Sequence, residues 1–222
     1  MRMLGFAEPE RTAEWLNSRG IAAFILKYRV VPDAAAGGGR PPGAPRAGIP
    51  QRKMPMGMGK ELSFREILDR RGNANPAPDD REHLEVIGMA IADGRQAIRL
   101  LRRDAARYGI DPKRIGILGF SAGGGVAIGT AVTESPDAYP DFAATIYGPS
   151  LVDVTVPPQG APLFIAVMDG HFNVTNGCAA LFTLWKEANR PVELHVYDHG
   201  YGPASGMPVA TWTDRLYDWL VA

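Results

Sequence analysis

The sequence feature that most constrains the fold is a glycine-bracketed turn near the middle of the chain. It reads Gly119-Phe120-Ser121-Ala122-Gly123 and joins an apolar run at 114–120 to a run of small residues at 122–132. The first run predicts a buried strand and the second predicts a helix. A serine at such a junction needs small residues two positions before and after it, because larger side chains would clash. The pattern therefore predicts a sharp turn that exposes the Ser121 hydroxyl.

A serine exposed at the carboxyl end of a buried strand is placed for nucleophilic chemistry. The backbone N–H of Ala122 and the following helix N-terminus would point at a developing oxyanion. Two other interpretations are a glycine-rich turn with a bystander serine and a phosphate-binding turn of the dinucleotide type. The second of these requires G-x-G-x-x-G, which this segment lacks. The context of strand, turn and helix favours the nucleophile.

Hydrophobic periodicity elsewhere predicts alternating strands and helices. We expect further strands over 21–26, 143–147, 163–168 and 192–197, and helices over 9–17, 62–70, 84–108, 176–188 and 210–220. This alternation predicts an α/β fold with a mainly parallel sheet that is covered on both faces. Trp212, Leu216 and Trp219 share one face of the last helix, which predicts that it packs on the sheet.

The domain organisation follows from the length of the chain and from one change in composition. A chain of 222 residues with 45% hydrophobic residues predicts a single domain, 1–222, with one sizeable core. Glycine, proline, arginine and methionine dominate 32–82, which predicts a long insertion there. Segments of this length are typical of lids, binding loops or flexible insertions.

Charge and cysteine usage exclude several classes of protein. Lys+Arg and Asp+Glu balance at 24 each, so no global field favours nucleic acid or a membrane surface. The single cysteine, Cys178, cannot form an intrachain disulfide, and no Cys/His cluster has the spacing of a metal site. No apolar run is long enough to span a membrane, and the first residues lack the apolar core of a signal peptide. We therefore expect a cytoplasmic protein with a small-molecule partner, no metal and no cofactor.

Three segments together resemble the serine esterases related to acetyl xylan esterases and hormone-sensitive-lipase-like carboxylesterases, which have the α/β-hydrolase fold. The segments begin at Ala13, Tyr108 and Gly119 and read AEWLNSRGIAAF, YGIDPKRIG and GFSAGG. The resemblance implies hydrolysis of short-chain or acetyl esters through an acyl-enzyme on Ser121, without a cofactor. It also implies a Ser, acid, His order along the chain.

The resemblance assigns the other two catalytic roles by position after the strands. Asp169 follows the strand at 163–168 and is the expected acid, with Asp141 and Asp153 as fallback candidates. His199 lies in the loop after the last strand and is the expected base. Its rival is His171, in the loop of the acid, while His195 is expected inside a strand and His83 at the start of a helix.

One departure from the family concerns the beginning of the chain. Relatives carry a Gly-rich oxyanion motif after a strand that precedes the helix at 9–17, and this sequence starts after that point. The departure favours two further expectations. One is oligomerisation, because a sheet edge would be left open. The other is an alternative function, in which a catalytically impaired homologue acts as a ligand-binding or assembly subunit.

Overall fold

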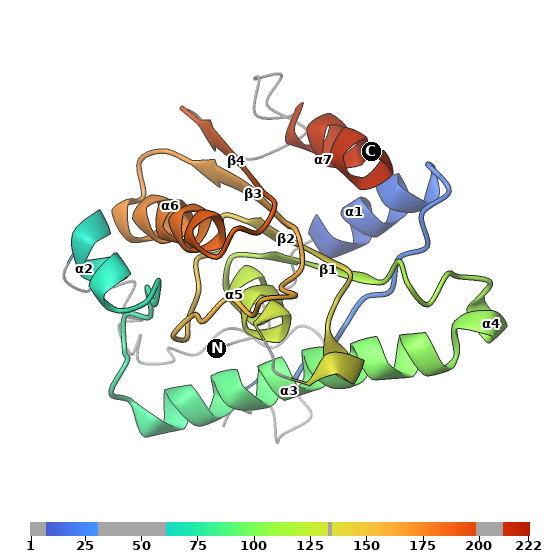
Figure 1. The fold of residues 1–222 in the computed structure, drawn as a ribbon, viewed down its shortest axis with the longest axis horizontal. Helices are drawn as coiled ribbons and strands as arrows, with labels where there is room; N and C mark the ends of the chain where they lie inside the picture. Colours follow the sequence, from blue (N-terminus) through green and yellow to red (C-terminus); the bar gives the residue numbers. More distant parts are fainter. Residues whose placement is uncertain (1–7, 31–60, 133–134, 199–210) are drawn as a thin grey trace, which may run out of the picture.

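The computed structural model describes residues 8–30, 61–132, 135–198 and 211–222, which form a parallel sheet between two layers of helices (Figure 1). The strands lie side by side in chain order, and all three pairings are parallel. They are β1 (Gly116–Phe120), β2 (Phe142–Ile146), β3 (Leu163–Met168) and β4 (Val192–Tyr197). The α/β class with a parallel sheet is therefore confirmed.

The helices follow the predicted order closely, with shifts of a few residues at their ends. They are α1 (Glu8–Asn17), α2 (Phe64–Asp69), α3 (Arg81–Arg103), α4 (Ala105–Tyr108), α5 (Ala122–Ala131), α6 (Phe172–Glu187) and α7 (Trp212–Val221), with a 3-10 helix η1 (Pro136–Ala138). The helix predicted over 84–108 is two helices, because Asp104 leaves the helical conformation between α3 and α4.

Strand β3 shows how the two faces of the sheet form two cores. Leu163, Ile165 and Val167 point to one face and pack with buried residues of α5 and α6, Trp185 among them. Phe164 and Ala166 alternate to the other face, which α7 covers. A strand buried on both faces must be apolar throughout, and all five of these side chains are 0% or 1% exposed. Trp212 and Leu216 of α7 are buried in the second core as predicted.

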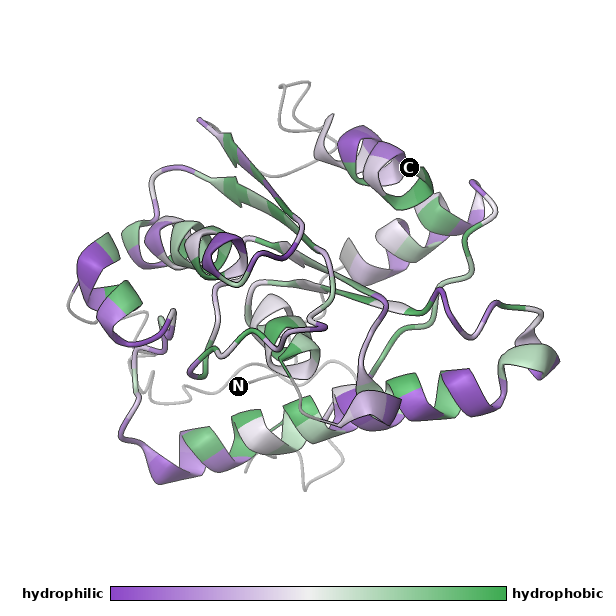
Figure 2. Cartoon of the chain, in the orientation of Figure 1, coloured by the Kyte–Doolittle hydropathy of each residue, from purple (hydrophilic) through white to green (hydrophobic). Residues whose placement is uncertain are grey.

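Helix α3 is amphipathic and packs on α5, the helix that contacts β1 and β2. Its apolar and polar residues alternate along its length (Figure 2). The Asp80 side chain caps its N-terminus by accepting from the backbone N–H of His83 at 3.1 Å. Ile91 of α3 lies against Gly129 of α5, where a Cβ would collide with its side chain. The small residue thus lets the two helices approach closely.

The strand predicted over 21–26 does not form. Residues 21–30 belong to no helix or strand, and Phe24 and Ile25 are 47% and 48% exposed. An apolar run becomes a strand only where a neighbouring backbone meets its N–H and C=O groups. In the part of the chain that the structure describes, β1 pairs only with β2, and no strand pairs with 21–30.

The end of the segment predicted as an insertion contributes to the core. Leu62 and Ile67 are 4% and 0% exposed and pack with Ala180 of α6. Asn173 of α6 accepts from the backbone N–H of Leu62 at 2.7 Å, and the Asn176 amide donates to the Leu62 carbonyl at 3.0 Å. The prediction of an insertion outside the core is therefore wrong for 61–80, while 31–60 lies outside the described residues.

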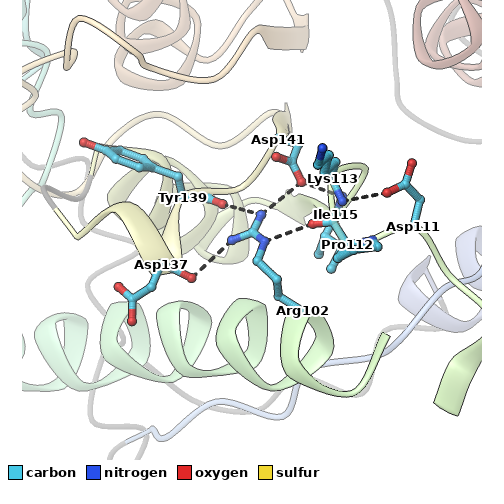
Figure 3. Close-up of polar contacts among 8 residues, drawn as sticks. All are labelled: Arg102, Asp111, Pro112, Lys113, Ile115, Asp137, Tyr139 and Asp141. Atoms are coloured by element: carbon cyan, nitrogen blue, oxygen red, sulfur yellow. Dashed lines mark hydrogen bonds and ion pairs between the residues drawn. The ribbon is translucent and has the colours of Figure 1, made fainter. Parts of the chain in front are cut away.

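The Arg102 side chain ties α3 to the amino-terminal edge of the sheet (Figure 3). Its guanidinium donates to the carbonyls of Pro112, Asp137 and Tyr139 and to the Asp141 carboxylate. Asp141 also accepts from the backbone N–H of Ile115 at 2.8 Å. One arginine thereby fixes the two loops that lead into β1 and β2.

Candidate active site

Ser121 occupies a strained backbone conformation at the carboxyl end of β1. Its φ is 50° and its ψ is −123°, a combination that costs a non-glycine residue about 1–3 kcal/mol. The surrounding backbone holds this turn, because the Ser121 N–H donates to the Ile146 carbonyl of β2 at 3.1 Å. The Ser121 carbonyl in turn accepts from the N–H groups of Gly124 and Gly125 and starts α5. The predicted strand-to-helix turn is present.

The predicted need for a small residue is confirmed at Gly119 and is wrong at Gly123, where the nearest atom to an added Cβ, Tyr28 Oη, would be 3.7 Å away. Gly119 and Gly148 make room for the turn. A Cβ on Gly119 would meet the carbonyl of Gly123 and would lie 2.6 Å from the Gly124 nitrogen, both of them backbone groups. A Cβ on Gly148, in the loop after β2, would lie 2.5 Å from the Ser121 carbonyl oxygen. The Thr145 hydroxyl closes this loop by donating to the Gly148 carbonyl at 2.6 Å. The turn is therefore enclosed by main chain that could not move aside cheaply.

The Ser121 side chain is exposed and does not cap the helix that follows it. A serine at a helix N-cap usually accepts from a backbone N–H of the first turn, but the Ser121 hydroxyl makes no capping bond. The residue is exposed. The Ala122 N–H lies in the first turn of α5, where the helix dipole is positive, and that turn holds no acidic residue. Within the described residues, the arrangement thus combines an exposed serine hydroxyl without a capping bond with a backbone N–H at the start of a helix.

Asp169 follows β3 at the same edge of the sheet. Its N–H donates to the Tyr197 carbonyl of β4 at 2.7 Å, and its Oδ1 accepts from the Gly170 N–H at 2.8 Å. The strand register places Asp169 two residues beyond the level of Ser121 and two strands away. Strand spacing then separates the two Cα atoms by roughly 12 Å. An imidazole that bonds to two side-chain oxygens holds those oxygens roughly 8 Å apart. The Ser121 and Asp169 side chains extend from their Cα atoms toward such an imidazole, so this Cα separation suits a bridging histidine.

The histidines lie in different places. His199, the expected base, lies outside the described residues. His171 is exposed at the N-cap of α6, in the same loop as Asp169, and its carbonyl accepts from the N–H groups of Val174 and Thr175. His195 lies within β4 with its Nε2 2.6 Å from Glu193 Oε1, as expected for a packed residue. His83 lies in the first turn of α3.

The two fallback acids have other roles in the structure. Asp141 lies at the amino-terminal edge of the sheet, where it holds Arg102 and Ile115. It is thus at the opposite end of the strands from Ser121. Asp153 accepts from the Asn73 amide at 3.0 Å and joins the loop after β2 to the segment before α3. Among these carboxylates, Asp169 alone follows a strand at the edge where Ser121 lies.

Other kinds of site are not found near the turn in the described ranges. No group of three or more His, Cys, Asp or Glu side chains there could hold a metal ion. A shallow hollow lies beside α3, lined by Arg99, Arg102 and Asp137. These groups pair with one another or with Asp141, so the hollow holds no uncompensated charge there. Among the helices that the structure describes, none is both long and apolar enough to cross a membrane.

One residue near the turn was not singled out from the sequence. The Tyr28 hydroxyl lies 3.7 Å from the position that a Cβ on Gly123 would occupy. Tyr28 is half-buried, and burial raises the pKa of its phenol. A polar aromatic residue two positions after the apolar run at 21–26 was the available signal.

The parallel sheet and the strained serine between β1 and α5 define an α/β-hydrolase fold. Residues 83–150, from α3 through the loop after β2, match the family model described as BD-FAE. This match includes the whole turn around Ser121. No curated protein sequence matches the chain significantly.

Several solved structures share the fold. An acetyl ester-xyloside bifunctional hydrolase from Caldicellulosiruptor lactoaceticus is 24% identical with a TM-score of 0.52, over 60% of this chain and 65% of that one. MGS-M1, an α/β-hydrolase enzyme from a Medee basin deep-sea metagenome library, is 23% identical with a TM-score of 0.50, over 60% and 63%. The carboxylesterase Cest-2923 from Lactobacillus plantarum is 17% identical with a TM-score of 0.51, over 61% and 68%. At these identities the likeness shows the fold, and it spans less than two thirds of the first structure's length.

Proposed function

We propose that this protein hydrolyses short-chain or acetyl carboxylic esters through an acyl-enzyme on Ser121. The observation that carries the proposal is the strained backbone of Ser121, which leaves an exposed, uncapped hydroxyl at the start of α5. Strain of this kind persists only where the surrounding structure enforces it, and it concentrates at functional sites. The solved structures of the same fold include a carboxylesterase and an acetyl ester hydrolase, which supports ester chemistry.

The proposed reaction assigns one role to each residue. Ser121 Oγ attacks the ester carbonyl carbon while its proton passes to His199, and the carbonyl π electrons move to oxygen. The Ala122 N–H donates to that oxyanion. The oxyanion then collapses, the C–O bond to the alcohol breaks, and the alcohol takes the proton from His199. Water releases the acid by the same steps, and Asp169 orients the imidazole throughout.

The test of the nucleophile compares Ser121→Ala with the wild type. We expect the variant to lose hydrolysis of p-nitrophenyl acetate and to lose labelling by a fluorophosphonate, with the wild-type adduct located on Ser121 by mass spectrometry. Ser18→Ala is the matched control, because Ser18 is an exposed serine that bonds only to the Trp15 carbonyl and Arg19 in the described structure. Equal rates for the wild type and Ser121→Ala would refute the proposal.

The test of the base compares His199→Gln with His171→Gln. Disabling one member of a catalytic triad lowers turnover by roughly 10⁴- to 10⁶-fold. We expect that loss for His199→Gln and a nearly unchanged rate for His171→Gln. Asp169 lies two residues before His171 in the sequence. A large loss for His171→Gln with a nearly unchanged rate for His199→Gln would therefore assign the base to His171.

A second candidate function is binding of ester or acid ligands without turnover, as a ligand-binding or assembly subunit. The observation that favours it is that no histidine among the described residues bonds to the Ser121 hydroxyl. A serine without a base keeps a pKa far above 7 and reacts slowly with a fluorophosphonate. Saturable ligand binding with no labelling at any pH would support this function over hydrolysis.

We also propose that the protein self-associates through the β1 edge of the sheet. In the described part of the chain, β1 bonds only to β2, so its other edge presents backbone groups that another strand can pair with. Light scattering of the purified protein tests this, and a monodisperse monomer would contradict it.

A further inference from the structure

Residues 21–30 bring a tyrosine hydroxyl to the turn that carries Ser121. Tyr28 Oη lies 3.7 Å from the position of a Cβ on Gly123, the second residue after Ser121. Adding one Cα–Cβ bond and one Cα–Cα step places Oη within roughly 9 Å of the Ala122 Cα at most. Tyr28 Oη therefore lies close to the first turn of α5, which begins at Ala122.

The position of Tyr28 is fixed by its neighbour in sequence. Arg29 forms a forked pair with Asp93 of α3, with Nη2 to Oδ1 at 2.7 Å and Nε to Oδ2 at 3.0 Å. The Arg29 backbone N–H adds a bond to Asp93 Oδ2 at 2.8 Å. Bonds from both the main chain and the side chain of one residue leave it little freedom. Because α3 packs directly on α5, this pair holds Tyr28 in register with the turn.

The Tyr28 hydroxyl has no structural task that would account for its burial. It forms no hydrogen bond within the described residues, although a buried tyrosine hydroxyl usually finds a partner. Burial raises the pKa of the phenol above its ordinary value near 10. The group therefore keeps its proton across the working range of an esterase and is available as a donor.

We propose that the Tyr28 O–H is the second donor to the oxyanion that forms at Ser121, beside the Ala122 N–H. This role rests on the proposed esterase function. The phenol donates a hydrogen bond as the carbonyl oxygen becomes negative, keeps its proton, and is unchanged when the alcohol leaves. A hydroxyl that is too far away for a hydrogen bond in the free enzyme can approach the oxyanion in the transition state. Catalytic hydrogen bonds commonly shorten in this way. Tyr28 thus does for this site what a backbone N–H does in many hydrolases.

The variant Tyr28→Phe removes the donor and keeps the aromatic ring that carries it. Loss of one oxyanion donor lowers kcat by roughly 10²- to 10³-fold. We expect that loss with p-nitrophenyl acetate, with KM changed by less than about twofold, because the donor acts on the transition state rather than on bound substrate. Binding of a boronic acid, which forms a tetrahedral adduct on serine, should weaken by a similar factor.

The control is Tyr108→Phe, because Tyr108 is 43% exposed and makes an edge-to-face contact with Phe24 rather than a contact with the turn. It should keep the wild-type kcat and boronate affinity. Thermal unfolding of each variant separates chemistry from folding, since Tyr28→Phe keeps its packing and should keep a Tm near the wild-type value. A purely structural role for Tyr28 would lower Tm without the selective loss of kcat.

The outcomes separate this inference from the function on which it rests. A wild type that reacts at Ser121, with Tyr28→Phe reacting at the same rate, overturns the role of Tyr28 and leaves the esterase standing. A wild type that neither turns over nor labels at Ser121 overturns both. A Tyr28→Phe variant that loses kcat and boronate affinity together, at an unchanged Tm, supports the donor.

Discussion

Replacing Gly119 by alanine tests whether main-chain crowding holds the turn at Ser121. The new Cβ would lie on the Gly123 carbonyl and 2.6 Å from the Gly124 nitrogen, and these atoms belong to the first turn of α5. No flexible side-chain end is available to move away, so the strand and the helix must separate. Ser121 lies between them, and its φ of 50° depends on their approach.

The magnitude follows from the cost of overpacking. Inserting a methyl group into a well-packed interior costs about 1–3 kcal/mol, and backbone atoms give way less readily than side chains. For a domain of 150–250 residues, each kcal/mol lowers Tm by roughly 2–4 °C. We therefore expect Gly119→Ala to lower Tm by roughly 2–12 °C and to abolish fluorophosphonate labelling of Ser121.

The matched control is a glycine in a helix with open space around it. Gly88 of α3 is exposed, and nothing lies within 4 Å of a Cβ built on it. Alanine is favoured over glycine within a helix by about 0.5–1 kcal/mol, so Gly88→Ala should raise Tm by roughly 1–4 °C. Circular dichroism melts of both variants measure the shifts. A Gly119→Ala protein that melts and labels like the wild type would refute the argument.

Three further predictions concern groups away from the turn. Burial raises the pKa of Cys178 to about 12, so native protein at pH 8 should not react with a disulfide reagent until guanidinium unfolds it. The hydrogen bond from Arg29 lowers the pKa of Asp93, so Arg29→Met should destabilise the protein at pH 7. The difference in Tm between the wild type and Arg29→Met should shrink as the pH falls below about 4, because Asp93 then takes up a proton. In a denaturant titration, Arg102→Met should lower the free energy of unfolding by about 2–3 kcal/mol, because four acceptors lose a charged donor. Arg65→Met, which removes an exposed ion pair, should lower it by less than about 0.5 kcal/mol in the same denaturant titration.

The turn at Ser121 could be predicted from the sequence because its determinants are contiguous. The strand, Gly119 and the helix lie within 116–131, so the turn can be recognised locally, although the Ile146 carbonyl and Gly148, which also enclose it, lie outside that stretch. Strands β3 and β4 were also predicted with their observed ends, because continuous apolar runs with short connections leave few alternatives. The position of Asp169 after β3 followed from the same reasoning.

The features that sequence reasoning missed depend on partners far apart in the chain. The run at 21–26 has the composition of a buried strand, yet nothing in its own residues shows whether a neighbouring strand will meet it. The stretch at 61–80 has the composition of a loop, but Leu62 and Ile67 find their burial on α6, more than one hundred residues later. The break at Asp104 is a different case, because it is a local change of backbone conformation, with φ −100° and ψ 16°, that hydrophobic periodicity does not detect.

Helix α3 connects the two ends of the sheet and so links the fold to the proposed chemistry. Its 23 residues span roughly 34 Å, enough to pass along the whole sheet. At its C-terminal end, Arg102 fixes the loops that lead into β1, the strand before Ser121, and into β2. In its middle, Asp93 holds Arg29 and through it Tyr28. The proposed nucleophile and the proposed donor thus come from distant parts of the chain and are both linked to α3, so loosening either attachment should lower activity before it unfolds the protein.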